Sequence, residues 1–431
     1  MKHFKLDIFL LAVAILFLGV NFFVLLNRRL ETTDEQITQY EIPVLKISLN
    51  GVTLEEIRKN DKSIKYGGNS AEFIYNGASR EFSNVEIKGR GNSTLGLEKQ
   101  PYQIKFNEKV DLLNLGFRKK YILLANYVDY SSIRNAMMLK LAEMIDEKYR
   151  VRGDFVELYV DDDYRGLYYL TTKIDIGKNA VDLRDKHGVL IELDSLHRKN
   201  ENCLEAEEDE CLILKDAVYE DDEVILKEAT DDFLKTFARL RRVAKAGDFK
   251  KVSELIDIQS FAEYFLISEF AVNPDAYVSS FYFYKDGFDD KIHVGPLWDY
   301  DYAFSNRDWI WGDNDDFYLP TQVMAQKKSL FVPENANSEA GKLMYYLMEI
   351  PEFRFEVDKI FKDKLSGHKE EFLEWTFKEA AKIKDAMERD SERWERDSGL
   401  FYSEVEYILD WMDKRYDFFE KEYGEKEWIF R

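Results

Sequence analysis

The hydrophobic positions of this chain follow three patterns in turn. A continuous apolar run near the N-terminus is followed by segments in which apolar and polar residues alternate, and these give way to long segments with helical spacing. Alternation is typical of strands with one buried face, and a spacing of three and four residues is typical of helices. We therefore predict an α+β protein with a β-rich N-terminal lobe and a helical C-terminal part, preceded by one transmembrane helix.

The apolar run extends from Ile8 to Leu26 and is interrupted only by Asn21. A helix needs about 20 such residues to span a bilayer. Its C-terminal end, Phe22 to Arg28, offers no small-residue cleavage site, so an uncleaved anchor is favoured over a cleaved signal peptide. A buried core helix is the third interpretation.

The orientation of this anchor follows from the charges that flank it. Two lysines and the free amine precede the run, and two arginines follow it, so the positive charge is slightly greater on the N-terminal side. The positive-inside rule then places the N-terminus in the cytoplasm. We predict an anchor over residues 1–30, a polar linker over 31–41, and a single-pass protein of the cell membrane with an extracytoplasmic body.

The body of the chain divides into strand-like and helix-like segments. Six segments have strand character, namely Val44 to Leu49, Ser70 to Tyr75, Asn84 to Lys88, Pro101 to Phe106, Phe155 to Val160 and Gly166 to Leu170. Helical segments are a helix with Ser131 as its N-cap, Asp222 to Ala246, Ile258 to Phe270, and most of Ser338 to Glu422. The predicted units are a catalytic domain over residues 42–330 and a helical subdomain over 331–431 packed on it.

Composition and charge limit what such a body can bind. The chain has 431 residues, a formal net charge of −22 and 15% aromatic residues. This aromatic content is typical of a folded protein, and the negative charge argues against non-specific nucleic-acid binding. The two cysteines, Cys203 and Cys211, lie in one acidic loop; a disulfide and two free thiols both remain open. Zinc is not expected, because further Cys or His ligands are missing from the sequence around them.

The stretch between Asp275 and Asp299 predicts a β-hairpin. An aromatic-rich strand, Ser279 to Lys285, leads into a turn-like segment that ends at Lys291, and an apolar strand returns to Trp298. Because the two strands of a hairpin run side by side, both acids are expected at the same end of it.

These acids are the strongest candidates for chemistry. Folding about Phe288 places Tyr277 opposite Asp299, with Asp275 about two positions away. Together with Asp301, the two acids repel one another unless a proton or a cation intervenes. The sequence therefore predicts a divalent metal site.

A glycine-containing loop precedes the acids in the sequence. Val85 to Lys88 is strand-like, Gly89 to Thr94 forms the loop, and Pro101 to Phe106 returns as a strand. Arg90, the loop hydroxyls and the backbone N–H groups can donate to phosphate oxygens, and Lys105 lies in the strand that follows. The same loop sequence also suits an ordinary turn.

The order of these parts matches that of protein kinases. A glycine-rich loop, a strand lysine, a catalytic Asp and a metal-binding Asp follow one another in both. Protein kinases have a metal-binding Asn five residues after the catalytic Asp, whereas this chain has Ser280 five residues after Asp275. A hydroxyl is a weaker metal ligand than an amide carbonyl, so this position departs from the pattern.

Between about residue 42 and residue 320 the chain resembles the spore coat protein H (CotH) kinase family. The segments that carry the resemblance are Ile87 to Thr94, Lys99 to Phe106, Leu123 to Asp129, Arg134-Asn135, Tyr164 to Ile174, Asn273 to Tyr277 and Gly295 to Asp301. The resemblance implies an atypical, divergent protein-kinase-like fold that uses ATP and a divalent cation to phosphorylate Ser or Thr of secreted or coat proteins. Spore-coat members are soluble, so their substrates need not be those of a chain with a predicted anchor.

The resemblance also implies roles for the acids. Asp275 corresponds to the catalytic-loop acid, which orients the acceptor hydroxyl and accepts its proton, and Asp299 to the metal-binding acid. Asp299, with Asp301 or Ser280, is then expected to hold Mg²⁺, Mn²⁺ or Ca²⁺, since oxygen ligands suit all three.

The predicted nucleotide-binding residues surround the phosphates. They are Arg90, Asn92, Ser93, Thr94, Lys105, Lys173, Asn126 and Arg134. Lys105 is the first choice for the phosphate-pairing lysine and Lys173 the second. A structural role remains open for Asn126, Arg134 and the neighbouring Asn135.

Three classes of function are consistent with the sequence. The first is a membrane-tethered kinase acting on Ser or Thr of cell-surface proteins. The second keeps the nucleotide site and transfers a phosphoryl or nucleotidyl group to a non-protein acceptor such as a surface polysaccharide. The third is a pseudokinase that binds nucleotide as a scaffold.

Overall fold

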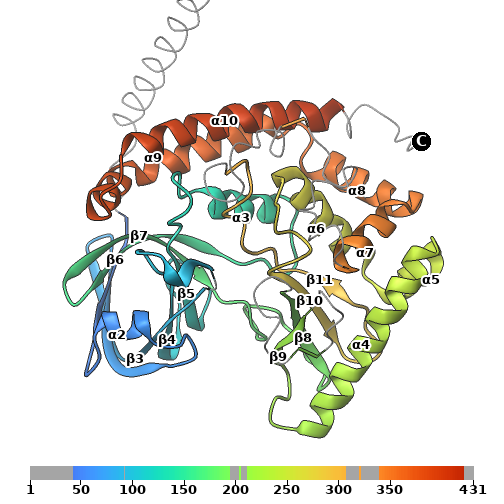
Figure 1. The fold of residues 1–431 in the computed structure, drawn as a ribbon, viewed down its shortest axis with the longest axis horizontal. Coiled ribbons are helices and arrows are strands. Elements are labelled where there is room, and N and C mark those ends of the chain that lie inside the picture. Colours follow the sequence, from blue (N-terminus) through green and yellow to red (C-terminus); the bar gives the residue numbers. More distant parts are fainter. Residues whose placement is uncertain are drawn as a thin grey trace, which may run out of the picture.

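The computed structural model describes residues 42–91, 93–194, 203–204, 211–306, 320–321 and 339–421. They form a β-lobe and a larger mixed lobe, with two long helices lying across both (Figure 1). This is the mixed α+β architecture expected from the sequence. The predicted anchor and linker lie outside the described residues. Within those residues, no helix combines the length and apolar character needed to cross a membrane.

The N-terminal lobe is a closed barrel with the strand order β1-β2-β3-β4-β5-β7-β6. Its strands are β1 (Val44–Ser48), β2 (Tyr66–Tyr75), β3 (Ala78–Gly89), β4 (Tyr102–Val110), β5 (Arg118–Leu124), β6 (Gly153–Val160) and β7 (Asp163–Thr172). Parallel pairing of β1 with β6 closes the barrel, and the other neighbours are antiparallel. Alternate residues such as Ile87, Ile104 and Tyr121 fill its interior and are fully buried, and the helix α2 (Leu54–Lys59) packs beside β3.

The second lobe is built on a four-stranded antiparallel sheet of order β11-β10-β8-β9. The strands are β8 (Gly188–Leu193), β9 (Leu212–Ala217), β10 (Phe281–Asp286) and β11 (His293–Val294). Among the described residues after the barrel strand β5, the helices are α3 (Arg134–Met144), α4 (Glu223–Lys245), α5 (Phe249–Leu255), α6 (Ile258–Ala271), α7 (Glu339–Met348), α8 (Pro351–Lys364), α9 (Lys369–Arg393) and α10 (Gly399–Phe419). A disulfide joins Cys203 to Cys211 between β8 and β9, which settles the alternative left open by the sequence.

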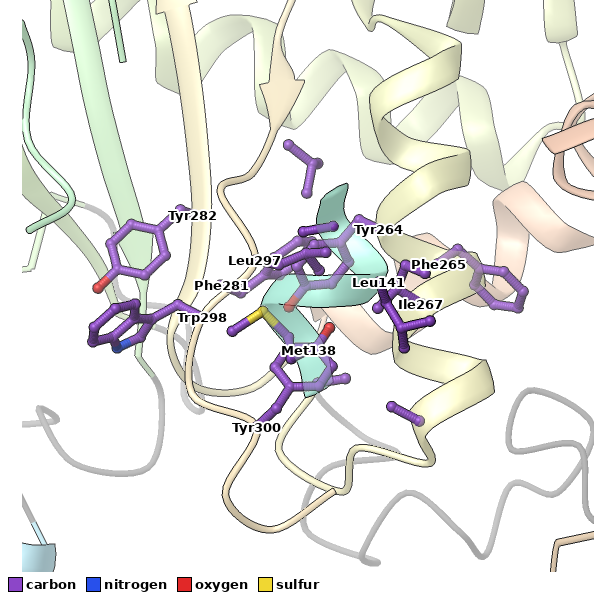
Figure 2. Packing of buried hydrophobic residues seen from close by; sticks show 14 of the residues in the cluster. Met138, Leu141, Tyr264, Phe265, Ile267, Phe281, Tyr282, Leu297, Trp298 and Tyr300 are labelled. Atoms are coloured by element: carbon purple, nitrogen blue, oxygen red, sulfur yellow. The ribbon is translucent and has the colours of Figure 1, made fainter. Parts of the chain in front are cut away.

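One continuous hydrophobic core joins this sheet to α3, α6 and the C-terminal helices. Figure 2 shows Phe281, Leu297 and Tyr300 packed with side chains of α3 and α6. Tyr282 and Trp298 belong to the same buried cluster but lie on the other side of these strands from Phe281 and Leu297. Successive strand residues point to opposite faces, so the segments that fill the core also present side chains to the space beside the barrel.

Helices α9 and α10 connect the two lobes (Figure 1). On the barrel side, the buried Lys99 Nζ lies 2.6 Å from Asp390 Oδ1 of α9 and also donates to the Leu167 carbonyl. On the other side, Arg415 of α10 is fully buried and donates to the Phe270 carbonyl at 3.1 Å. Breaking a buried pair of this kind costs about 3–5 kcal/mol, so the C-terminal helices are an integral part of the fold.

Two local predictions were wrong in detail. Helix α3 begins at Arg134 rather than directly after Ser131, because the Asp129 carboxylate accepts hydrogen bonds from both the Ser131 and Arg134 amides and forms a turn before the helix. The predicted hairpin is present, but β11 has only two residues and the register pairs Phe283 with Val294, one residue away from the register expected.

Candidate active site

A cleft of about 810 Å³ lies between the barrel and the second lobe. One wall consists of β3, β4, β5 and the end of β7, and the other carries Asp275, Ser280, Asp299 and Asp301. The basic residues that line it are Lys62, Lys65, Lys88, Arg90, Lys105, Lys120, Lys173 and Lys215. The acidic ones are Asp61, Glu86, Glu192, Asp275, Asp299 and Asp301. In a chain with a net charge of −22, a cleft with an excess of basic side chains is a local exception.

Three lysines form a row across neighbouring strands of the barrel wall. Lys105 of β4 pairs with Lys120 of β5, and Lys173 follows Thr172, whose partner is the residue after Lys120. The residues next to these lysines along β4 and β5 point into the barrel core. Because successive strand residues point to opposite faces, the lysines point outward, toward the cleft. Lys105 lies 3.8 Å from Glu86 and Lys120 lies 4.0 Å from Asp175, so acids offset only part of the repulsion between these like charges, and the row favours an anionic ligand.

Lys173 is perturbed mainly by burial. Burial, together with smaller contributions from the positive charges of Lys120 and Lys215, lowers the pKa of Lys173 to about 8 against the opposing charges of Asp175 and Asp216. Asp175 itself pairs with Arg118, whose guanidinium also donates to the Lys173 carbonyl at 2.9 Å. The ammonium group of Lys173 is therefore a partly desolvated cation that gains from an anion brought into the cleft.

Lys88 and Arg90 form a second basic group at the C-terminal end of β3. Burial lowers the pKa of Lys88, with further contributions from Lys65, Arg90 and Lys215. The Arg90 guanidinium lies 4.8 Å from the ring centre of Trp298, in cation–π geometry, and so reaches the wall that carries the acids.

The acidic wall is built from two strained loops. Ser280 Oγ donates to Asp299 Oδ2 at 2.9 Å, which joins the loop after Asp275 to the loop before Asp301. Ser280 and Asp299 both have positive φ, 51° and 70°. Such conformations cost about 1–3 kcal/mol each in non-glycine residues and cluster at functional sites.

The acids also perturb one another. Burial raises the pKa of Asp275 to about 7, and the charges of Asp299 and Asp194 add to the effect. Burial raises the pKa of Asp301 well above its usual value, with contributions from Asp299, Asp275 and Asp129. A cation placed among these carboxyl groups would relieve both the desolvation and the repulsion.

The donor set suits a metal that is shared with a substrate. Within the part of the chain that the structure describes, no three His, Cys, Asp or Glu side chains are grouped closely enough to hold a metal by themselves. Mg²⁺ is usually bound by one or two carboxylates and completes its shell with phosphate oxygens and water. Asp299 and Asp301 fit such a partial site.

The loop that carries these two acids is held from behind by the region around α3. The Tyr300 amide donates to Asn135 Oδ1 at 3.0 Å, and Asn135 Nδ2 donates to Asn126 Oδ1 at 3.1 Å. The Leu297 amide donates to Glu147 Oε1 at 2.8 Å, and Arg134 Nε donates to the Ala303 carbonyl at 3.0 Å. The acid loop is therefore fixed on both sides of Asp299.

Comparison with protein families identifies this architecture. The model of the family described as CotH kinase protein matches residues 87–419. The chain belongs to the CotH kinase family. Comparison with curated proteins finds no match. The CotH match begins at the end of β3 and continues through β11 to the end of α10, so it leaves out residues 42–86 of the noted resemblance and extends past its end near residue 320.

The structure brings most of the predicted CotH site residues into the cleft. Those that line it are Arg90, Thr94, Lys105, Asn126, Lys173, Asp275, Ser280, Asp299 and Asp301. Asn92 lies outside the described residues, and Ser93 is described only by its backbone, as the first residue of a 3₁₀ turn.

Arg134 is placed differently from the prediction. Its side chain is fully buried, forms ion pairs with Asp129 and Glu404, and does not line the cleft. This position argues against direct contact with a nucleotide and agrees with the structural alternative.

The sequence reasoning missed other basic residues of the cleft. Lys88, Lys120 and Lys215 line it, and Lys215 Nζ lies 2.6 Å from Glu192 Oε2. Lys88 and Lys105 alternate with core residues along strands that had been predicted, so this alternation was the available signal. Lys120 and Lys215 lie on strands that had not been predicted.

Proposed function

We propose that this CotH-family protein is a metal-dependent, membrane-tethered kinase that transfers the γ-phosphoryl group of ATP to Ser or Thr of secreted or cell-surface proteins. The observation that carries this proposal is the pairing of a basic wall with an acidic wall across one cleft, with Asp275 and Asp299 on the same side. The membrane tether and the extracytoplasmic location rest on residues 1–30 of the sequence alone.

The charge of the cleft matches this ligand. Eight basic and six acidic side chains line it, which leaves an excess of two positive charges. A nucleoside triphosphate with one divalent cation carries about two net negative charges. The complex would neutralise the cleft, with phosphates toward the lysine row and the metal toward the acids.

The chain's own residues then have separate tasks. Lys105, Lys120 and Lys173 hold the phosphates in position, and Arg90 approaches them from its place over the ring of Trp298. Asp275 orients the acceptor hydroxyl and accepts its proton, for which a pKa near 7 is well matched at neutral pH. Phosphoryl transfer depends mainly on positioning and charge neutralisation, which these residues provide.

Asp299 and Asp301 would hold the divalent cation. When bound, the cation neutralises charge on the transferring phosphoryl group. Ser280 supports this pair by donating its hydroxyl hydrogen to Asp299.

A pseudokinase is the second candidate. The observation that favours it is the hydroxyl of Ser280, which is engaged with Asp299 at the position where protein kinases have a metal-binding Asn. In that case the cleft binds nucleotide and metal without transferring phosphate, and the protein acts as a scaffold at the cell surface.

The test uses the full-length protein in detergent with ATP labelled at either the γ- or the α-phosphate. It is supplied with Mg²⁺, Mn²⁺ or Ca²⁺ and a membrane-protein extract. The kinase proposal expects γ-label on protein Ser or Thr, lost in Asp275→Asn and Asp299→Asn. The control is Asp358→Asn, a buried acid of α8 in the same lobe that does not line the cleft.

The other outcomes separate the alternatives. Label from the α-phosphate indicates nucleotidyl transfer, and γ-label on polysaccharide indicates a non-protein acceptor. Nucleotide binding without transfer under any of these conditions would support the scaffold and contradict the kinase.

A further inference from the structure

We infer that Asp194 is a positioning residue of this site, which fixes the loop of Asp275 from behind through the hydroxyl of Ser279. The inference rests on the proposed phosphoryl transfer, because it assigns to Asp194 the placement of the acid that receives the acceptor proton. Neither the sequence motifs nor the family resemblance pointed to this residue.

The contact between Asp194 and the catalytic loop is direct. Ser279 Oγ donates to Asp194 Oδ1 at 3.1 Å, and the Ser279 amide donates to the Asp275 carbonyl at 3.2 Å. Ser279 therefore connects the Asp194 carboxylate to the backbone of Asp275. On the far side of this turn, Ser280 bonds to Asp299, so two adjacent hydroxyls hold the loop between two acids.

Asp194 is itself rigidly placed. It directly follows Leu193 of β8, which pairs with Phe281 of β10 in the central part of the sheet. Its amide donates to the carbonyl of Cys211 at 3.1 Å, and Cys211 is joined to Cys203 by the disulfide. The carboxylate is thus attached to a sheet and a cross-link rather than to a loop that moves with Asp275.

Asp194 and Ser279 are both buried, and burial of the Asp194 carboxylate costs free energy. Asp194 is 1% exposed and Ser279 is 6% exposed. A buried carboxylate costs several kcal/mol of desolvation, and the hydrogen bond from Ser279 offsets part of this cost. Asp194 also lies near enough to Asp275 for its charge to contribute to the raised pKa of that acid.

The position of Asp194 indicates support rather than direct chemistry. It does not line the cleft, whereas Asp275, Ser280 and Asp299 do. A residue behind the loop acts by holding a reactive group within a few tenths of an ångström of its working position. A displacement of about 1 Å in such a site can lower the rate about 100-fold.

The experiment compares three variants with the matched control. Asp194→Ala removes the acceptor, Ser279→Ala removes the donor, and Asp194→Asn keeps an oxygen acceptor without the charge. Asp358→Asn, in α8, is the control for loss of a buried carboxylate. For each protein we would measure kcat, the KM for ATP, and amide hydrogen exchange of the peptide covering residues 275–281.

Asp194→Ala and Ser279→Ala are expected to lower kcat about 10- to 100-fold with the KM for ATP unchanged. The double variant should be no slower than the slower single variant, because both substitutions remove the same contact. Asp194→Asn should retain activity within a few-fold of the wild type. Exchange over 275–281 should be faster in the two alanine variants and unchanged in the control.

Several results would overturn the inference. They are wild-type kcat in both alanine variants, effects that multiply in the double variant, or a general rise in exchange across the lobe. If the wild-type protein transfers no phosphate, the proposed function fails. The exchange experiment still decides whether Asp194 fixes the loop. If Asp194→Ala does not fold, Ser279→Ala and Asp194→Asn provide the same comparison.

Discussion

The hydrogen bond between Asn135 and the acid loop should be essential to the stability of the whole site. Asn135 is 4% exposed and forms two bonds, accepting from the Tyr300 amide at 3.0 Å and donating to Asn126 Oδ1 at 3.1 Å. Substitution Asn135→Leu keeps the branched shape and the number of side-chain heavy atoms and therefore leaves no large cavity. It removes both bonds at once, between side chains that are only 4% (Asn135) and 8% (Asn126) exposed at the edge of the cleft.

The cost follows from the two groups left behind. The Tyr300 N–H and Asn126 Oδ1 each lose a partner, and a buried polar group without a partner costs about 1–3 kcal/mol, so the sum is about 2–6 kcal/mol. The Asn126 amide does not turn to compensate, because its Nδ2 already donates to the Ser132 carbonyl at 2.9 Å. If the acid loop shifts so that these groups bond to water instead, the loss of stability is smaller but Asp299 is displaced.

Denaturant unfolding of the full-length protein measures the first outcome, and the metal concentration for half-maximal phosphate transfer measures the second. Met138→Leu is the control, since Met138 is 2% exposed on the same helix and a volume-conserving apolar exchange costs less than about 1.5 kcal/mol. A loss of stability below about 1 kcal/mol with wild-type metal dependence would refute the role assigned to this contact.

Two further predictions concern charge. Lys173→Met removes a charge-assisted contact worth about 1.5–3 kcal/mol and should raise the KM for ATP about 10- to 100-fold. Lys105→Met should have a smaller effect, because Lys105 is more exposed and lies 3.8 Å from Glu86. Equal increases in KM would contradict this ranking of the two lysines. Burial raises the pKa of Glu147 from 4.5 to about 8. The folded protein therefore binds the proton of Glu147 more tightly than the unfolded chain does, and its stability falls as the pH rises from 4.5 to about 8. Glu147→Gln should therefore be more stable than the wild type at pH 8 by a few kcal/mol and show no advantage below pH 4.5, as thermal unfolding across this range would reveal.

The sequence predicted the elements that have a strong local signal. Helices α4 and α6 begin after Asp222 and Asp257, whose carboxylates cap them, and both were expected within a residue or two of their bounds. The barrel strands with alternating residues were also found. Strand β8 was not, because all six of its residues are buried and its sequence lacks alternation.

In the candidate site, too, contacts within a local structure were predicted from the sequence, and contacts between distant segments were not. Asp275 and Asp299 were predicted to converge because a hairpin is a local structure, and a one-residue error in its register did not separate them. The lysine row depends on the pairing of Lys105 with Lys120 and on the return of β7 beside β5, which are non-local. Asp194 meets Ser279 only because β8 pairs with β10 across a long intervening segment.

The pairing of charges differs between parts of the scaffold and the site. Some buried ions of the scaffold are paired with the opposite charge, as in Lys99 with Asp390 and Arg134 with Asp129. In the cleft, by contrast, Lys173 lies beside other lysines, and Asp301 lies beside other acids. Like charges held together destabilise the folded protein, and a ligand that carries both signs relieves this repulsion on both walls at once. A metal–triphosphate complex has this character, because it presents a cation on one side and phosphate oxygens on the other. The nucleotide alone would neutralise only the basic wall, and the metal alone would neutralise only the acidic wall. Nucleotide and metal are therefore expected to bind cooperatively.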